Sequence, residues 1–163
     1  MAYIVPQMTL IPQMKAMSCW YASARMLIRW RGDQTQSSEM GIIDPEIDAA
    51  SAALRDVNNG ITNPQIVAFA RRIGLEPVPP MSPTEQAIEG WLRWYGPLWV
   101  NGKTHIVVIA GVANGKVLVY DPSPQYKGGI NWRSLNGWYI GNDVDARDTG
   151  ADVEAVFLHC PER

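Results

Sequence analysis

The stretch QMKAMSCWYA, residues 13–22, decides the fold because it places a thiol at the start of a predicted helix. Ser18 is a suitable N-cap, apolar side chains then recur at three- and four-residue spacing, and Gly32 can end the helix. Cys19 would occupy the first turn, where unpaired N–H groups and the helix dipole favour a thiolate. Gln13, six residues upstream, carries an amide that could bind an oxyanion. The stretch therefore predicts a cysteine nucleophile.

Two later residues can complete a catalytic site with Cys19. His105 precedes the apolar run 106–109, and Asp121 follows a second apolar run. The histidine would take the thiol proton and return it to a leaving amine, while the aspartate would hold the ring through its other nitrogen. The chain has only two histidines, which makes His105 the predicted base.

These residues resemble papain-like cysteine peptidases. Gln13 and the Ser-Cys-Trp triplet 18–20 are similar to the oxyanion glutamine and nucleophile segment of that family. The segments GPLWV at 96–100 and YDP at 120–122, together with His105, are similar to a bacterial branch. That branch comprises double-glycine peptidases, which process exported peptides, and related secreted effector or toxin proteases.

The sequence also departs from the papain pattern. Papain has asparagine where this chain offers Asp121, so the orienting group would be a carboxylate. Met17 replaces the glycine before the Ser-Cys pair, which could alter the wall of the substrate groove. The resemblance extends over roughly residues 3–125.

The predicted fold class is α+β and papain-like, in one domain spanning residues 1–163. Its N-terminal nucleophile helix and further helices, up to about residue 96, would pack on a twisted antiparallel sheet formed by about residues 97–163. The active site would lie in the cleft between these layers. Trp20 and Trp99 would line the substrate groove, and the alternative for Trp99 is a purely structural role.

Local signals predict the other elements. Helices are expected from Asp44-Pro45 to about residue 56, from Asn63-Pro64 to Gly74, and from a capping box at 82–85 to Gly96. An Asn-Gly turn at 114–115 predicts a hairpin. The expected strands are 98–100, 104–112, 116–120, 138–140 and 153–158.

Composition excludes several classes of function. In 163 residues, 47% apolar and 18% charged side chains indicate a folded enzyme-sized domain. A net charge of -2 without a basic stripe argues against nucleic acid as a partner. The apolar runs are too short for membrane insertion, and the N-terminus lacks a signal peptide. The protein is expected to be cytoplasmic when made, and any secretion into a target cell would use a route independent of a signal peptide.

Individual residues have alternative interpretations. Gln7 is the rival oxyanion donor if the helix register is different. Cys160 ends an apolar strand-like run and is expected to be a structural thiol, since a disulfide with Cys19 would consume the nucleophile. The two cysteines and two histidines lack zinc-site spacing, so neither a metal nor a cofactor is expected.

The predicted function is a cysteine endopeptidase that cuts a protein after a small or Gly-Gly sequence through a thioester intermediate. By resemblance it could serve as an antibacterial or host-targeted toxin, with a cognate immunity protein as partner. The same Cys/His/Asp residues would also serve a deamidase, transglutaminase or acyltransferase. A third interpretation is a non-catalytic binding domain.

Overall fold

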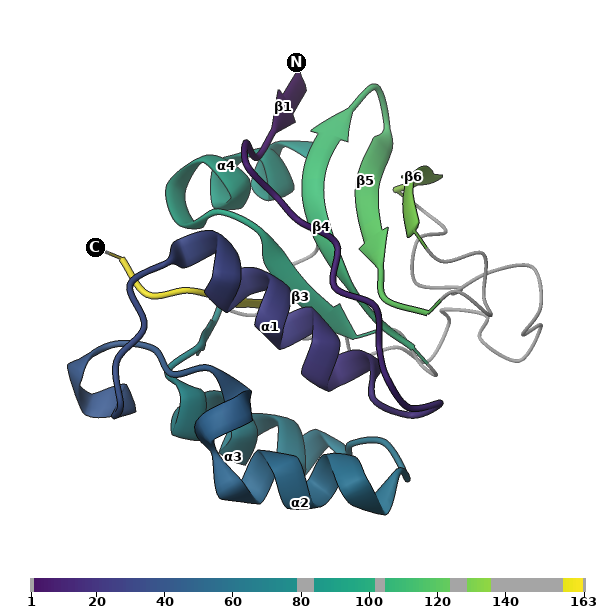
Figure 1. Cartoon of the computed structure of the whole chain (residues 1–163). Coiled ribbons are helices and arrows are strands. Elements are labelled where there is room, and N and C mark those ends of the chain that lie inside the picture. The colour runs from purple at the N-terminus through teal and green to yellow at the C-terminus, as the bar shows by residue number, and fades with distance from the viewer. Residues whose placement is uncertain (1, 79–83, 102–104, 124–128, 136–156, 163) are drawn as a thin grey trace.

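A seven-stranded antiparallel sheet organises the fold (Figure 1). The structure is a computed structural model that describes residues 2–78, 84–101, 105–123, 129–135 and 157–162. The strand order is β2-β7-β3-β4-β5-β6, and β1 pairs with β4 beyond the end of β3. The strands are β1 (Ala2–Ile4), β2 (Glu76–Pro77), β3 (Leu98–Asn101), β4 (Ile106–Ala113), β5 (Lys116–Asp121), β6 (Gly129–Ser134) and β7 (Phe157–His159).

The β4–β5 hairpin forms where the Asn-Gly signal predicts it. Asn114 and Gly115 have φ angles of 51° and 73°, the left-handed pair that a two-residue turn between twisted strands requires. The apolar runs on both sides then pair from Ala113–Lys116 to Val108–Tyr120, with a register shift between Ile109 and Gly111. The predicted strands 98–100 and 116–120 are confirmed. Of the predicted strand 104–112, residues 106–112 lie in β4.

The sheet has members that the sequence patterns did not predict. β1 and β2 come from the N-terminal part of the chain, and β6 follows β5. The predicted division into a helical part and a sheet part is therefore too simple, because N-terminal residues contribute strands. The predicted strand at 138–140 lies outside the described residues, and of 153–158 only 157–158 are described, in β7.

Helix α1 (Cys19–Arg31) carries the predicted nucleophile. It ends at Gly32, whose φ of 81° is the left-handed C-cap that glycine adopts without strain, as predicted. Ser18 occupies the N-cap position but makes no side-chain cap bond. Its hydroxyl instead bonds the backbone N–H and C=O of Lys15, both at 3.1 Å, so Ser18 is the N-cap residue by position, as predicted, without a side-chain bond to the helix.

The remaining helices have conventional caps. The helix predicted from Asp44 is split into a 3-10 turn (Pro45–Ile47) and α2 (Ala49–Val57), because Asp44 and Asp48 cap one each. Helix α3 (Asn63–Ile73) has a full capping box between Thr62 and Gln65 and stops at Gly74. Thr84 caps α4 (Glu85–Tyr95), while Ser82 of the predicted capping box lies outside the described residues. A short 3-10 helix spans Ser38–Met40.

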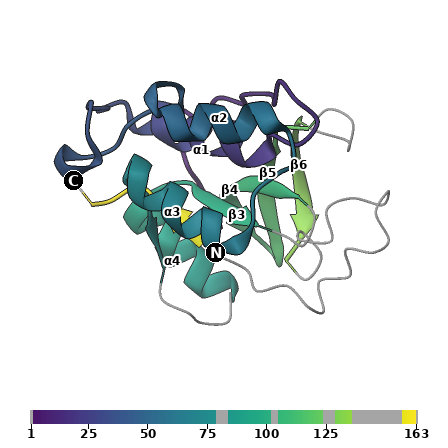
Figure 2. The ribbon, with the colours of Figure 1, turned by 90° about the horizontal axis from the view of Figure 1, so that it is seen from below.

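Helices α1 and α4 cover opposite faces of the sheet (Figure 2). On one face, the Trp99 indole donates to the Trp20 carbonyl of α1 at 3.0 Å. On the other, Tyr95 of α4 stacks on His159 of β7 with ring centroids 3.6 Å apart. Helix α3 supports α1 through an edge-to-face contact of Phe69 with Trp20. Within the described residues, no helix has the length and apolar character needed to cross a bilayer.

Candidate active site

Cys19 is the first residue of α1 and is partly exposed. The chain approaches it through the turn in which Ser18 bonds Lys15, so the thiol leaves the backbone where the helix begins. Within the described residues, no acceptor bonds the Cys19 backbone N–H, which is one of the amides that a helix start leaves unpaired. Thiol and free N–H therefore lie together at the positive end of the helix dipole.

His105 and Asp121 come together at one end of the sheet, at the start of β4 and the end of β5. The imidazole Nε2 lies 2.6 Å from Asp121 Oδ1, and both side chains are buried. The Ser123 backbone N–H also donates to Oδ1, at 2.9 Å, in an Asx turn. Arg133 of β6 donates to the other carboxylate oxygen, Oδ2, at 2.6 Å. The carboxylate is thus held from three directions.

Cys19 completes the chain of contacts through the imidazole. Burial alone would lower the pKa of His105, but hydrogen bonds and charge interactions with Asp121 and Cys19 outweigh it and raise the pKa to about 9. Because Nε2 is bonded to Asp121, Nδ1 is the ring nitrogen that can serve the thiol. Burial raises the pKa of Asp121, yet His105 and Arg133 together hold it below its usual range. At neutral pH the pair is an imidazolium beside a carboxylate.

Gln13 is near this site but its amide has other partners. Its Nε2 donates to the carbonyls of Lys15 and Ala16, at 2.9 and 2.8 Å, which uses both N–H bonds. Its backbone N–H donates to the Pro122 carbonyl at 2.8 Å and so joins the loop before α1 to the residue after Asp121. The rival Gln7 is exposed in a left-handed turn after β1, with φ of 64°.

The geometry agrees with a match to a family of known enzymes. The model for papain-like cysteine protease AvrRpt2 matches residues 3–136, most of the chain. The chain belongs to this papain-like cysteine protease family. No curated protein matches it.

Two solved structures share the fold of this papain-like cysteine protease. One is the peptidase domain of Streptococcus ComA, a bi-functional ABC transporter involved in a quorum sensing pathway. It has a TM-score of 0.58 and 18% identity, with 94% of this chain and 98% of that chain covered. The other is a double glycine motif protease from an AMS/PCAT transporter in complex with the leader peptide, with a TM-score of 0.56 and 16% identity over 98% and 94% of the two chains. The α+β papain-like fold is thereby confirmed.

The two tryptophans predicted to line the substrate groove of this protease are in its core. Trp20 and Trp99 are both 0% exposed, because Trp20 packs on Phe69 and Tyr21 while Trp99 lies in the interior strand β3. The predicted substrate contact by their side chains is therefore wrong. Successive residues on a helix are turned by about 100°, so Trp20 can face the core while its neighbour Cys19 stays partly exposed.

Arg133 and Ser123 contribute to the site but were not identified from the sequence. Ser123 stands two residues after Asp121, the position at which an Asx turn supplies an N–H, so a local signal for it existed. Arg133 is brought in by the pairing of β6 with β5, and the alternation of Ile130 and Trp132 with polar residues is the pattern that could have revealed that strand.

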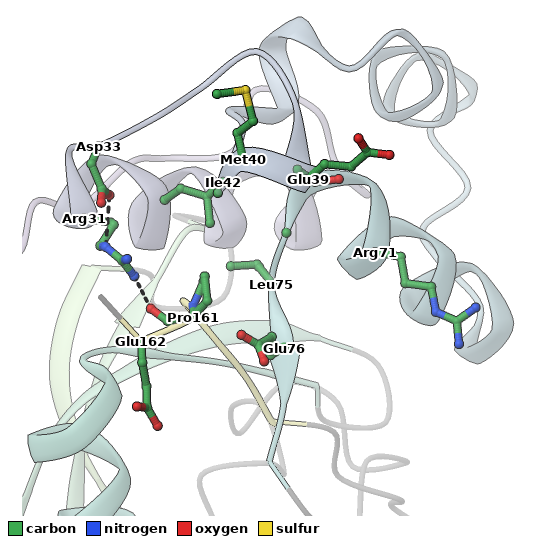
Figure 3. Close-up of a pocket in the computed structure, with 13 residues that line it drawn as sticks. Arg31, Asp33, Glu39, Met40, Ile42, Arg71, Leu75, Glu76, Pro161 and Glu162 are labelled. Carbon is green, nitrogen blue, oxygen red and sulfur yellow. Dashed lines mark hydrogen bonds and ion pairs between the residues drawn. The ribbon is translucent and has the colours of Figure 1, made fainter.

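The protease also has a pocket of about 500 Å³ at the far end of α1 from Cys19 (Figure 3). It lies between the 38–42 segment, β2 and the C-terminal residues 161–162. Arg31 at its wall pairs with Asp33 at 2.9 Å and also bonds the Pro161 carbonyl. None of the predicted site residues lines it, and its mixed charges indicate no single class of ligand.

The second cysteine of the protease is separate from the site. Cys160 is buried, and its thiol bonds the Leu27 carbonyl of α1 at 3.7 Å. Both cysteines are free thiols. In the part of the chain that the structure describes, no three histidine, cysteine, aspartate or glutamate side chains are grouped as a metal site would require.

Proposed function

We propose that Cys19, His105 and Asp121 hydrolyse a peptide bond in a protein substrate, with Cys19 as nucleophile. The observation that carries the proposal is the continuous contact from the thiol at the start of α1 through His105 to the buried Asp121 carboxylate. An imidazolium next to a thiol and the positive end of a helix both favour the thiolate, which is the reactive form.

In the proposed first step, the Cys19 sulfur attacks the scissile carbonyl carbon and the carbonyl oxygen becomes an oxyanion. His105 then gives its proton to the leaving amine as the carbon–nitrogen bond breaks, which leaves a thioester on Cys19. Asp121 keeps the imidazole oriented and stabilises its charged form. In the second step, water loses a proton to His105 and attacks the thioester, releasing the carboxylic acid and restoring the thiol site.

The backbone N–H of Cys19, which has no acceptor among the described residues, is the proposed first donor to the oxyanion. Gln13 is the proposed second donor. Its amide must exchange one of its bonds, to Lys15 or Ala16, for the oxyanion when substrate binds. Such an exchange replaces one acceptor with a charged one, which makes the stronger hydrogen bond.

We further propose that the scissile bond follows a small residue or a Gly-Gly pair in an extended segment. Support comes from the double glycine motif protease of the AMS/PCAT transporter, which has a similar fold. A narrow groove would select glycine by excluding side chains rather than by binding them.

The experiment is a panel of peptides and unfolded proteins incubated with wild type, Cys19→Ala and His105→Ala, with the products read by mass spectrometry. Cleavage into two fragments that depends on Cys19 and falls sharply when Leu or Phe replaces the last glycine is expected. Equal cleavage after Leu or Phe would remove the glycine preference. A mass increase of about one dalton without cleavage, or joined molecules, would assign the site to deamidation or transamidation instead.

The proposed setting is that of a toxin or effector delivered into another cell, with an immunity protein that blocks the cleft in the producer. The support is the resemblance of GPLWV at 96–100, His105 and YDP at 120–122 to the bacterial branch that includes effector proteases. Products of neighbouring genes can be co-expressed and tested for binding and for protection of Cys19 from alkylation. If none binds or protects, the immunity partner is excluded.

A further inference from the structure

The Asp121 carboxylate has a partner that the three proposed catalytic residues do not include. Arg133 Nη2 donates to Oδ2 at 2.6 Å, while His105 uses Oδ1 at the same distance. The side chains of Arg133 and Asp121 are 12% and 0% exposed, so water screens their ion pair weakly. The two oxygens of one buried carboxylate thus serve two different cations.

The register of β6 places this arginine. It pairs Val117 with Arg133 and Val119 with Asn131, and alternation puts both β6 side chains on the face of the sheet to which Asp121 belongs. Asn131 Oδ1 accepts a hydrogen bond from Arg133 Nε at 2.8 Å. The guanidinium is therefore held by separate acceptors at Nε and Nη2, which fixes its plane as well as its position.

Arg133 also changes the net charge of the cluster that surrounds Asp121. With Arg133 included, the four side chains of Cys19, His105, Asp121 and Arg133 have no net charge as thiol and imidazole, and none as thiolate and imidazolium. Without the arginine the group would carry one negative charge in both states. A buried unpaired charge costs free energy. Without Arg133, His105 or Asp121 would therefore hold a proton more tightly, because that proton neutralises the charge.

We propose that Arg133 is a positioning residue of this protease, which fixes the Asp121 carboxylate against His105 and moderates how tightly the imidazole holds its proton. This inference rests on the proposed roles of Cys19, His105 and Asp121. Arg133 acts through Asp121, so its loss should lower kcat and leave KM nearly unchanged. His105 would become a weaker acid toward the leaving amine.

The test compares Arg133→Met, which keeps an apolar stem, with Arg133→Lys, which keeps the charge. Arg93→Met is the control for loss of an arginine, because Arg93 is an exposed residue of α4 bonded to Glu89. Each folded variant is assayed for kcat and KM across pH, and the His105 ring is titrated by NMR. For Arg133→Met we expect kcat to fall about tenfold or more and the His105 midpoint to rise by about one pH unit.

Arg133→Lys should keep the wild-type midpoint with a smaller loss of kcat, and Arg93→Met should behave as wild type. An unchanged midpoint and kcat in folded Arg133→Met would overturn the inference while leaving the proposed function intact.

If Arg133→Met does not fold, Arg133→Lys and Asn131→Ala, which removes the acceptor at Nε, decide the question. Wild-type kcat in both would overturn it. If wild type shows no cleavage that depends on Cys19, the proposed function fails, and the NMR midpoints still test the action of Arg133 on His105.

Discussion

At the scale of single residues, the main feature of the site is that several groups bond the one carboxylate of Asp121. Asp121 is bonded by an imidazole, a guanidinium and a backbone N–H, and it therefore stays ionised although it is buried. An ionised Asp121 keeps His105 protonated beside the thiol. The packing around Asp121 therefore raises the pKa of His105, together with the contact that His105 makes with Cys19.

The protonation of His105 can be measured directly because the chain has two histidines. We expect one imidazole to titrate near pH 9, and the other, His159, below its ordinary pKa because burial disfavours its charged form. Asp121→Asn should move the high midpoint downward, since it removes the charge that stabilises the imidazolium. Assignment uses His159→Phe, which preserves stacking on Tyr95. Two midpoints near 6.5 would contradict the proposed ion pair.

The protonation of His105 also leads to a prediction about the rate at which Cys19 is alkylated. If imidazolium favours the thiolate, His105→Ala should slow alkylation of Cys19 by iodoacetamide at pH 6–7 by about tenfold or more. Cys160 is too buried to serve as the reference thiol, so added glutathione provides the free-thiol rate. Equal rates for Cys19 in wild type and in the variant would show that the histidine does not activate it.

Sequence alone could predict that Cys19, His105 and Asp121 come together, because each stands at the start or end of an apolar periodic run. It could not supply Arg133, whose role depends on the register between β5 and β6, nor the internal bonds of the Gln13 amide. Nor could it distinguish a core tryptophan from a groove tryptophan at position 20. Such distinctions depend on which side of an element faces the interior.

At the scale of elements, local signals worked where a turn or cap is chemically specific. The Asn-Gly hairpin and the glycine stops at Gly32 and Gly74 are examples. The short strands β1 and β2 escaped detection because two or three residues show no periodicity, and their pairing partners lie far away in the chain. Long-range pairing, rather than propensity, makes these segments strands.

The two glycine stops give a matched pair for a stability test. Both have left-handed φ angles, 81° at Gly32 and 87° at Gly74, so alanine at either should cost about 1 kcal/mol in conformation. At Gly32 the added methyl would meet no atom within 4 Å, whereas at Gly74 it would run into the Gly41 backbone carbonyl. Urea unfolding should therefore show a clearly larger loss for Gly74→Ala. Equal losses would mean that the backbone segments around Gly74 and Gly41 can move apart without a cost in free energy.

At the scale of the whole molecule, the two ends of the site come from distant parts of one framework. Cys19 stands on a helix supported by α3, and His105 and Asp121 stand at one end of the sheet. The bond from Gln13 N–H to the Pro122 carbonyl joins these parts next to the proposed catalytic residues. Unfolding must separate His105 from both of its partners, so the charge state of the site is coupled to global stability.

This coupling predicts how stability depends on pH. His105 has a pKa of about 9 in the folded protein and an ordinary value near 6.5 when unfolded, so the folded state binds the proton more tightly. The resulting stabilisation is fully present below about pH 6.5 and is lost as pH rises through 9, with a total of about 3 kcal/mol at most.

Urea unfolding of wild type and His105→Gln between pH 6 and 10 measures this stabilisation. The free energies of unfolding should converge toward the alkaline end, because deprotonation removes from wild type the imidazolium that the variant lacks throughout. A constant difference across that range would show that the His105 proton is held no more tightly in the folded protein than in the unfolded chain.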